Sequence, residues 1–276
     1  MSAVDTQFQD DAPVAAIRPM AALIRLLAPW GRRLIVPFSL LLAWEAAVDW
    51  GLLDRNTMPA PSAVLRALAD LAELGRLWPD VAASLGRIVV GFSLATIAGI
   101  ALGGLLGWYR RLAEYLLPVI ELIRPISVIA WIPIAILWFG LGNTSAWFLI
   151  FLGAFFPIFT NAFAGVRALA PTHLRVAQCL GVGRRQFVVS VLLPSALPLI
   201  LTGMRIGLGT GWTCVIAAEL IASTSGLGYM IQIARTMIET EKVLGGMLVI
   251  GLIGFAMNVA MAKLERWLTP WRAHEH

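Results

Sequence analysis

The chain has 276 residues, of which 59% are hydrophobic and only 13% are charged, and its mean hydropathy is +0.82. A soluble domain of this length needs far more charge to cover its surface, so these values exclude an ordinary water-soluble protein. The net charge of +5 is not arranged as a basic stripe with interleaved aromatic residues, so no nucleic-acid partner is expected.

The first 15 residues form an acidic tail that contains Asp5, Asp10 and Asp11. They lack the basic start and short apolar core of a secretory signal. We therefore expect residues 1–15 to be a disordered tail and residues 16–53 to hold a first membrane span that is retained.

Six apolar blocks are long enough to cross a bilayer, which takes about 20 residues. They are residues 34–53, 88–108, 116–141, 147–166, 199–221 and 243–264. Inside lipid every backbone polar group needs an internal partner, so these blocks are expected to be helices. The sequence therefore predicts an all-α integral membrane protein with about six transmembrane helices. One core domain would cover residues 87–264, followed by a C-terminal tail, residues 265–276.

The longest loop, residues 54–86, is punctuated by Pro59, Pro61 and Pro79. Between them the sequence predicts one short amphipathic helix over residues 62–77, with Ser62 as its N-cap. Such a helix is expected to lie along the membrane surface or against a neighbour.

The basic residues indicate the orientation of the spans. Of the 21 Lys and Arg residues, six fall on one side, Arg124 and Arg205 lie inside or at the edge of spans, and the remaining 13 fall on the side that holds both termini. The six residues on the side opposite the termini are Arg55, Arg66, Arg76, Arg87, Arg235 and Lys242. By the positive-inside rule both termini are predicted to be cytoplasmic.

Two spans carry glycines at every fourth position, which lets helix backbones approach closely. Gly99, Gly103 and Gly107 lie in the second span, and Gly203, Gly207 and Gly211 in the fifth. Plain helix packing explains this spacing. A functional interpretation is that these smooth faces also permit sliding between two packings.

A cytoplasmic loop, residues 167–190, interrupts the apolar pattern with two short helical pieces. Thr172 is a candidate N-cap, and Leu174, Val176, Ala177 and Leu180 recur at helical spacing. Gly181 and Gly183 are expected to end this piece, because glycine accepts a left-handed turn. A second piece is expected from Arg184 and Arg185 to Pro194. This elbow is either a solvated connector or a docking element for a groove on a soluble partner.

The elbow resembles the signature loop of the membrane subunits of ATP-binding-cassette (ABC) importers. That pattern is Glu-Ala-Ala, three residues, Gly, nine residues, then Ile-x-Leu-Pro. The corresponding residues here are Arg175-Val176-Ala177, Gly181 and Val191-Leu192-Leu193-Pro194. The spacing is kept, but Arg175 replaces the leading acidic residue, so the acidic contact that the family's loop usually offers its ATPase is absent.

Further segments resemble the permeases for nitrate, sulfonates and taurine, over roughly residues 58–272. They are residues 118–142 (PVIELIRPISVIAWIPIAILWFGLG) and residues 193–231. In the first, Ser127-Val128 replaces a common Pro-Pro. The segments RVAQCLG, RIGLGTGW and LTPW are most similar to taurine permeases.

The resemblance implies a type I ABC importer fold in a bacterial inner membrane and a division of labour between subunits. Two copies of the chain would form the pore, a cytoplasmic ATPase dimer would bind the elbows, and a periplasmic binding protein would deliver a small anionic or zwitterionic substrate. The chain itself would have no cofactor and would not be an enzyme, since ATP and magnesium would bind the partner. The sequence agrees in containing no G-x-x-x-x-G-K-[ST] phosphate loop.

Polar residues within membrane spans are costly and often functional. Glu121 and Arg124 are three residues apart, a spacing at which they pair on one helix face. An arginine beside the path would attract an anionic substrate, whereas the plainer explanation is a structural ion pair. The candidates for the translocation path are Glu121, Arg124, Trp131, Arg205, Gly207, Gly211 and Glu219.

Two other classes of function stay open at this point. A transporter driven by an ion gradient would need inverted repeats and helices broken at the midplane, and an intramembrane enzyme would need a nucleophile or metal cluster. Neither pattern is evident in the sequence. Nitrate and bicarbonate remain alternatives to taurine and other sulfonates as the substrate.

Overall fold

The structure is a computed structural model that describes residues 35–169, 177, 179 and 181–271. It divides into two compact units, Met1–Ala63 and Val64–His276, which are described one at a time. The described part of both units contains helices and no strand, in agreement with the predicted fold class.

In the first unit, the helix over residues 35–49 falls within the first predicted span. Its Glu45 carboxylate accepts hydrogen bonds from the Ser62 backbone N–H at 3.0 Å and from the Ser62 hydroxyl at 2.6 Å. Helix α2 (Pro61–Glu73) begins one residue before Ser62, because proline at the first helical position needs no N–H partner. The prediction that Ser62 is the N-cap is therefore wrong.

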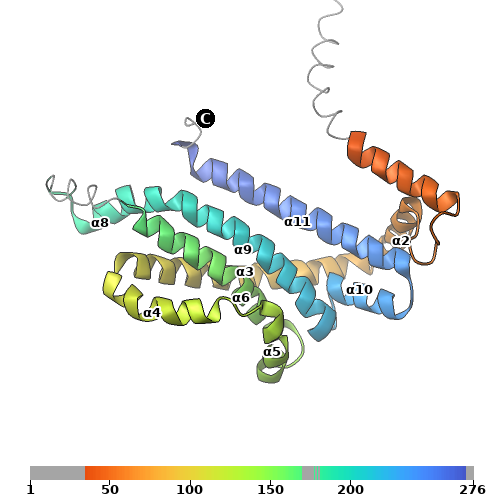
Figure 1. The fold of residues 1–276 in the computed structure, drawn as a ribbon, viewed down its shortest axis with the longest axis horizontal. Coiled ribbons are helices and arrows are strands. Elements are labelled where there is room, and N and C mark those ends of the chain that lie inside the picture. The colour runs from red at the N-terminus through yellow and green to blue at the C-terminus, as the bar shows by residue number, and fades with distance from the viewer. Residues whose placement is uncertain (1–34, 170–176, 178, 180, 272–276) are drawn as a thin grey trace, which may run out of the picture. The chain divides into compact units, whose positions relative to one another are not determined.

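The second unit is built on three long helices, α3 (Leu77–Trp108), α6 (Asn143–Arg167) and α9 (Leu193–Ala222). They lie side by side, and α6 packs against both of the others (Figure 1). On the α3 side, a Cβ added to Gly103 would lie 2.7 Å from the Phe159 carbonyl oxygen, and one added to Gly99 would lie 2.9 Å from Ile158 Cγ2. Only glycine permits this approach, so the four-residue spacing marks a contact face.

The glycines of α9 form the other contact face of α6. A Cβ on Gly203 would lie 2.6 Å from Asn161 Cβ, and one on Gly207 would lie 2.9 Å from the Ala154 carbonyl oxygen. Gly211 is less tightly enclosed, with the Ile88 side chain 3.3 Å from its added Cβ. Both glycine faces therefore hold α6 at the centre of the bundle.

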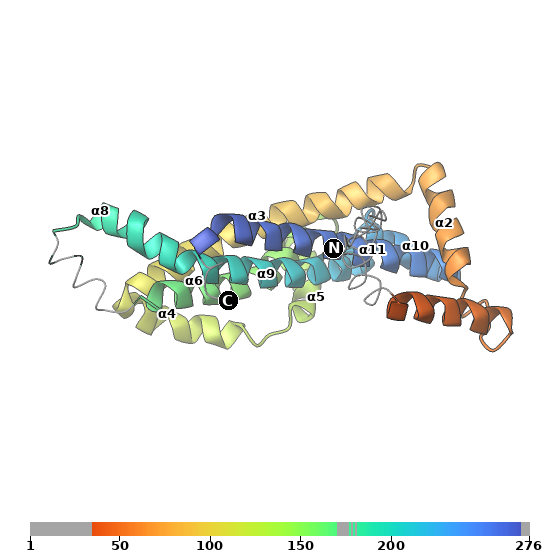
Figure 2. The same cartoon turned by 90° about the horizontal axis from the view of Figure 1, so that it is seen from above.

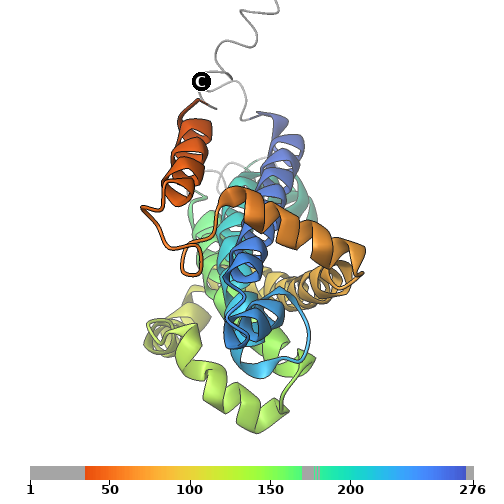
Figure 3. The same ribbon diagram turned by 90° about the vertical axis from the view of Figure 1, so that its right-hand side faces the viewer.

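The predicted third span, residues 116–141, is not a single helix. Instead α4 (Arg110–Ile123) is followed by a 3₁₀ turn, η2 (Val128–Trp131), and by α5 (Ile132–Phe139), with a bend of 85° between the two arms. In Figures 2 and 3 this bent segment lies along one side of the bundle. The bend falls at Arg124–Ser127, where Pro125 has no N–H to continue the helical hydrogen bonds, a signal that the length of the apolar block concealed.

Two further helices pack against the C-terminal part of α9, namely α10 (Leu227–Thr236) and α11 (Thr240–Leu268). In the described part of the chain, four helices are long and apolar enough to cross a membrane, or five if the bent segment is one span. The first predicted span is described only from residue 35, so it does not enter this number.

The start of the fifth predicted span lies earlier in the chain than the sequence suggested. Before α9, helix α8 (Arg184–Phe187) leads into a π-helical turn, η3 (Val188–Leu192), in which the Leu193 N–H bonds the Val188 carbonyl. The wide turn directly precedes Pro194, whose ring would clash with a preceding carbonyl in a regular α-helix. The result is one helical run of 38 residues, Arg185–Ala222.

Candidate functional site

The turn of the elbow is set by Gly181. Its φ of +70° lies in the left-handed region, and the Val182 N–H donates to the Ala177 carbonyl at 3.0 Å. This 6→1 bond closes the end of a helix with glycine just beyond it, as the sequence predicts. Gly183 has a different role from the predicted one: its carbonyl accepts the Phe187 N–H at 2.9 Å, so it begins α8 instead of ending the preceding piece.

An apolar cluster joins the elbow to the ends of the long helices. Ala177, Phe187 and Leu192 are buried together, with Trp108 at the end of α3 and Val166 near the end of α6 packed against them. The Trp108 and Phe187 ring centroids are 6.2 Å apart. The elbow is therefore packed against the ends of α3 and α6, and it continues directly into α9.

Only some of the remaining residues of the predicted docking element fall within the described part of the chain. Thr172, Leu174, Arg175, Val176 and Leu180 lie outside the described residues. Arg185 is exposed on α8, and Pro194 lies in the first turn of α9.

A buried polar network joins α3 to the C-terminal end of α9. The Arg87 guanidinium donates to the Glu219 carboxylate at 2.7 Å, and the two side chains are 5% and 0% exposed. Ser84 donates to the same carboxylate at 2.8 Å, and the Gly228 N–H donates to it at 2.9 Å. Glu219, a predicted path residue, is therefore enclosed by hydrogen-bond donors in this conformation and does not line an open path.

Arg87 also donates hydrogen bonds to residues other than Glu219. It donates to the Asn143 side chain at 2.8 Å, to the Ser225 carbonyl at 2.7 Å and to the Ser225 hydroxyl at 2.8 Å. The sequence predicts Arg87 on the extracytoplasmic side, just before the second span, and the structure places it within the longer helix α3. Its partners are 56 or more residues away along the chain, so no local pattern identified the network. The only sequence signal was the helical spacing of Asp80, Ser84 and Arg87.

The two intramembrane arginines differ in their surroundings. Arg205 donates to the Asn258 side chain at 2.9 Å and lies 3.9 Å from the Glu265 carboxylate, both on α11. Arg124 lies at the end of α4 and lines a cavity. The ion pair predicted for Glu121 and Arg124 is not formed within the described structure, and both side chains are exposed.

The other predicted path residues take part in packing. Trp131 contacts Phe148 with ring centroids 6.3 Å apart, beside a cluster of α5, α6 and α9 side chains. Gly207 faces α6, and Gly211 faces both Ile88 of α3 and Ile150 of α6. These three positions contact neighbouring helices in this conformation.

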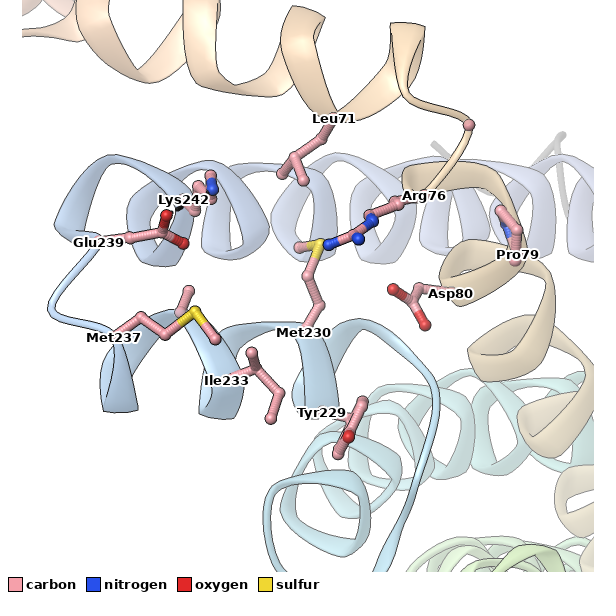
Figure 4. Close-up of a pocket in the computed structure, with 12 residues that line it drawn as sticks. Leu71, Arg76, Pro79, Asp80, Tyr229, Met230, Ile233, Met237, Glu239 and Lys242 are labelled. Carbon is pink, nitrogen blue, oxygen red and sulfur yellow. Dashed lines mark hydrogen bonds and ion pairs between the residues drawn. The ribbon is translucent and has the colours of Figure 1, made fainter.

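A cavity of about 500 Å³ lies between the start of α3, helix α10 and the start of α11. Figure 4 shows Arg76 and Met230 pointing toward one another and Glu239 joined to Lys242, whose atoms are 2.7 Å apart. Asp80, on the same wall, accepts the Gly226 N–H at 2.8 Å. Most of the charged side chains that line this cavity are therefore already paired with other groups of the protein.

These features define a class of protein. Long apolar helices, glycine faces that permit close packing and an ion pair sealed inside the bundle together describe a multi-pass α-helical membrane protein. Within the described residues, the elbow packs against the ends of two of the three central helices.

Comparison with known proteins gives the family. Residues 95–274 match the family described as "Binding-protein-dependent transport system inner membrane component". The taurine transport system permease protein TauC of Escherichia coli is 41% identical over 237 residues, covering 84% of this chain and 86% of TauC. The putative aliphatic sulfonates transport permease protein SsuC of Bacillus subtilis is 35% identical, covering 88% of each chain.

Among solved structures, an inward-facing conformation of the MetNI methionine ABC transporter is similar in fold. Its TM-score is 0.63 at 19% identity, covering 72% of this chain and 98% of that chain. The chain belongs to the family of inner membrane components of binding-protein-dependent transport systems. It is an ABC importer permease of the taurine, sulfonate and nitrate branch, and it is not an enzyme.

Proposed function

We propose that this chain is the pore-forming subunit of an importer for taurine or another aliphatic sulfonate, driven by a separate ATPase that binds the elbow. The observation that carries the proposal is the apolar cluster of Ala177, Phe187 and Leu192 with Trp108 and Val166. A connector without function would not need to be fixed to the ends of α3 and α6.

The mechanism follows from how the elbow continues into the bundle. When ATP closes the ATPase dimer, the two elbows of a permease dimer move together. Each elbow pushes the helical run Arg185–Ala222, which is continuous and so acts as a lever. The glycine faces of α3 and α9 let these two helices repack against α6 at a low steric cost, and hydrolysis resets them.

The proposed substrate rests on the names of the relatives. Taurine and aliphatic sulfonates are the substrates named for the two relatives reported above. A sulfonate group is a compact anion, and arginine is the side chain best suited to bind it. Nitrate and bicarbonate are the alternatives that the same branch suggests.

The remaining partners follow from this function. The cytoplasmic side would carry both termini and the elbow, as the distribution of basic residues indicates. A periplasmic binding protein would dock on the opposite face. ATP and magnesium would bind only the ATPase, so the permease itself would need no cofactor.

Reconstitution tests the proposal. The permease, its ATPase and the binding protein are incorporated into proteoliposomes, and uptake of labelled taurine, ethanesulfonate, nitrate and bicarbonate is measured with and without ATP. We expect uptake of a sulfonate that requires both ATP and the binding protein. Uptake by the permease alone, abolished by an ionophore and unaffected by ATP, would show a gradient-driven carrier instead.

A further inference from the structure

The bend between α4 and η2 forms one wall of an open cavity of about 400 Å³ against the middle of α6. This volume falls in the range of about 300–1,000 Å³ that is usual for small-molecule sites. One wall is the bend itself, from Arg124 to Val128, and the other is the α6 face between Leu152 and Asn161, with Ile206 of α9 beside it.

The cavity lies at membrane depth. Helix α6 has 25 residues and is therefore about 37 Å long at about 1.5 Å per residue, and Leu152 to Asn161 form its central part. Helix α4 has 14 residues, about 21 Å, which is shorter than the hydrocarbon core of about 30 Å. Since α4 begins at Arg110 and Arg111, a charged pair suited to the membrane surface, a helix of this length that enters the bilayer there would end inside the apolar layer.

Arg124 brings a positive charge to this depth without a protein partner. Its guanidinium makes no hydrogen bond or ion pair with any part of the chain that the structure describes. Arg205, by contrast, is bonded to Asn258 and lies near Glu265. An ionised side chain in a membrane is expensive and marks ion or substrate pathways unless it is paired. An anion that enters the cavity would supply the missing partner.

Neutral donors line the same cavity. The Asn161 amide donates one N–H to the Pro157 carbonyl at 2.9 Å and has a second N–H to offer. Ser127, in the bend, has a hydroxyl that bonds none of the described residues. Thr160 is different, since its hydroxyl already donates to the Phe156 carbonyl at 2.8 Å. The cavity thus combines one cation with two neutral donors, which suits a compact oxyanion.

We propose that this cavity binds the sulfonate group of the substrate within the membrane, with Arg124 as the cationic anchor and Ser127 and Asn161 as neutral donors. The proposal rests on the proposed function and adds to it a defined site between α4 and α6. The apolar walls from Leu152, Phe156 and Ile206 would contact the carbon chain of the sulfonate.

Uptake by charge variants tests the site. Arg124→Gln, Arg124→Lys and the matched control Arg111→Gln, which changes an exposed arginine on the same helix, are each reconstituted with ATPase and binding protein. Copurification of the ATPase checks that each variant is folded and assembled. Loss of a charge-assisted bond lowers affinity about 10- to 100-fold, so we expect Arg124→Gln to lose taurine uptake by that factor. Arg124→Lys should recover part of it, and Arg111→Gln should match the wild type.

Two outcomes would overturn the site. The first is wild-type uptake by Arg124→Gln, and the second is an equal loss in Arg111→Gln, which would indicate a general effect of charge. If the wild-type complex imports neither taurine nor ethanesulfonate, the proposed function is contradicted. The variants contradict the site alone when the wild-type complex does import a sulfonate.

A labelling experiment covers the case in which Arg124→Gln does not assemble. Ser127→Cys is made in a background in which Cys179 and Cys214 are replaced by serine and alanine. We expect a sulfonate-bearing methanethiosulfonate reagent to label Ser127→Cys, and we expect saturating taurine to slow the labelling at least about tenfold. An unchanged labelling rate with taurine would contradict binding in this cavity.

Discussion

The hydroxyl of Thr210 in α9 donates a 2.8 Å hydrogen bond to the carbonyl of Gly153 in α6. That carbonyl would ordinarily bond the N–H four residues later, but the residue there is Pro157, which has none. A proline within a membrane helix is tolerated when a neighbouring side chain satisfies the freed carbonyl. Thr210 does so from another helix and thereby joins α6 to α9.

This bond predicts the effect of an almost isosteric substitution. Thr210→Val leaves the Gly153 carbonyl without its partner in an apolar setting, and we expect a loss of about 1–2 kcal/mol of stability. The measurement is the temperature at which the detergent-solubilised protein loses its monodisperse elution peak. Thr213→Val is the matched control, because the Thr213 hydroxyl bonds only the Gly209 carbonyl of its own helix. An equal shift in both variants would contradict the interhelical role of Thr210.

The buried ion pair predicts a larger effect. Arg87→Met leaves the Glu219 carboxylate in the bundle without its cation, and breaking such a pair costs about 3–5 kcal/mol. The double variant Arg87→Met, Glu219→Leu removes the stranded charge and should recover part of the loss. Both are followed by thermal unfolding in detergent.

A surface ion pair provides the control for that prediction. Arg55 and Asp49 are 3.1 Å apart, but their side chains are 72% and 58% exposed. Arg55→Met should therefore cost at most about 1 kcal/mol. A loss in Arg55→Met as large as that in Arg87→Met would contradict the importance assigned to burial.

The glycine face of α9 predicts a contrast between two positions two residues apart. Gly207→Ala places a Cβ 2.9 Å from the Ala154 carbonyl oxygen and from Ile158 Cγ1, so α6 and α9 must separate. An alanine at Gly209 meets nothing within 4 Å. We expect Gly207→Ala to lower both thermal stability and transport and Gly209→Ala to leave both unchanged. Normal transport by Gly207→Ala would contradict a tight contact face that repacks during transport.

The sequence was sufficient for features that depend on nearby residues. The apolar blocks predicted the long helices, the glycine spacing marked both contact faces of α6, and Gly181 marked the turn of the elbow. Each of these depends on spacing along one helix or on the backbone freedom of a single residue. The elbow's motif could be identified even though Arg175 departs from the family's acidic residue.

The features that the sequence missed depend on distant partners or on small changes of backbone. Arg87 was counted only as a basic residue on the extracytoplasmic side, because its partner Glu219 is 132 residues away and no local pattern links the two. The bend after Arg124 coincides with Pro125, a local signal that was passed over because the flanking residues form one long apolar block. The π-helical turn before Pro194 lengthens α9, because it accommodates a proline that was expected to interrupt the helix.

The most direct test of the account measures ATP hydrolysis by the reconstituted complex with and without taurine-loaded binding protein. Gly181→Val is compared with Gly183→Val, because Gly181 has a φ of +70° that a β-branched residue rarely adopts, whereas Gly183 lacks a left-handed φ and has open space around its Cβ position. We predict that the wild type and Gly183→Val respond to the loaded binding protein and that Gly181→Val does not. Full stimulation in Gly181→Val, with normal uptake, would contradict an elbow that transmits force from the ATPase to the helices.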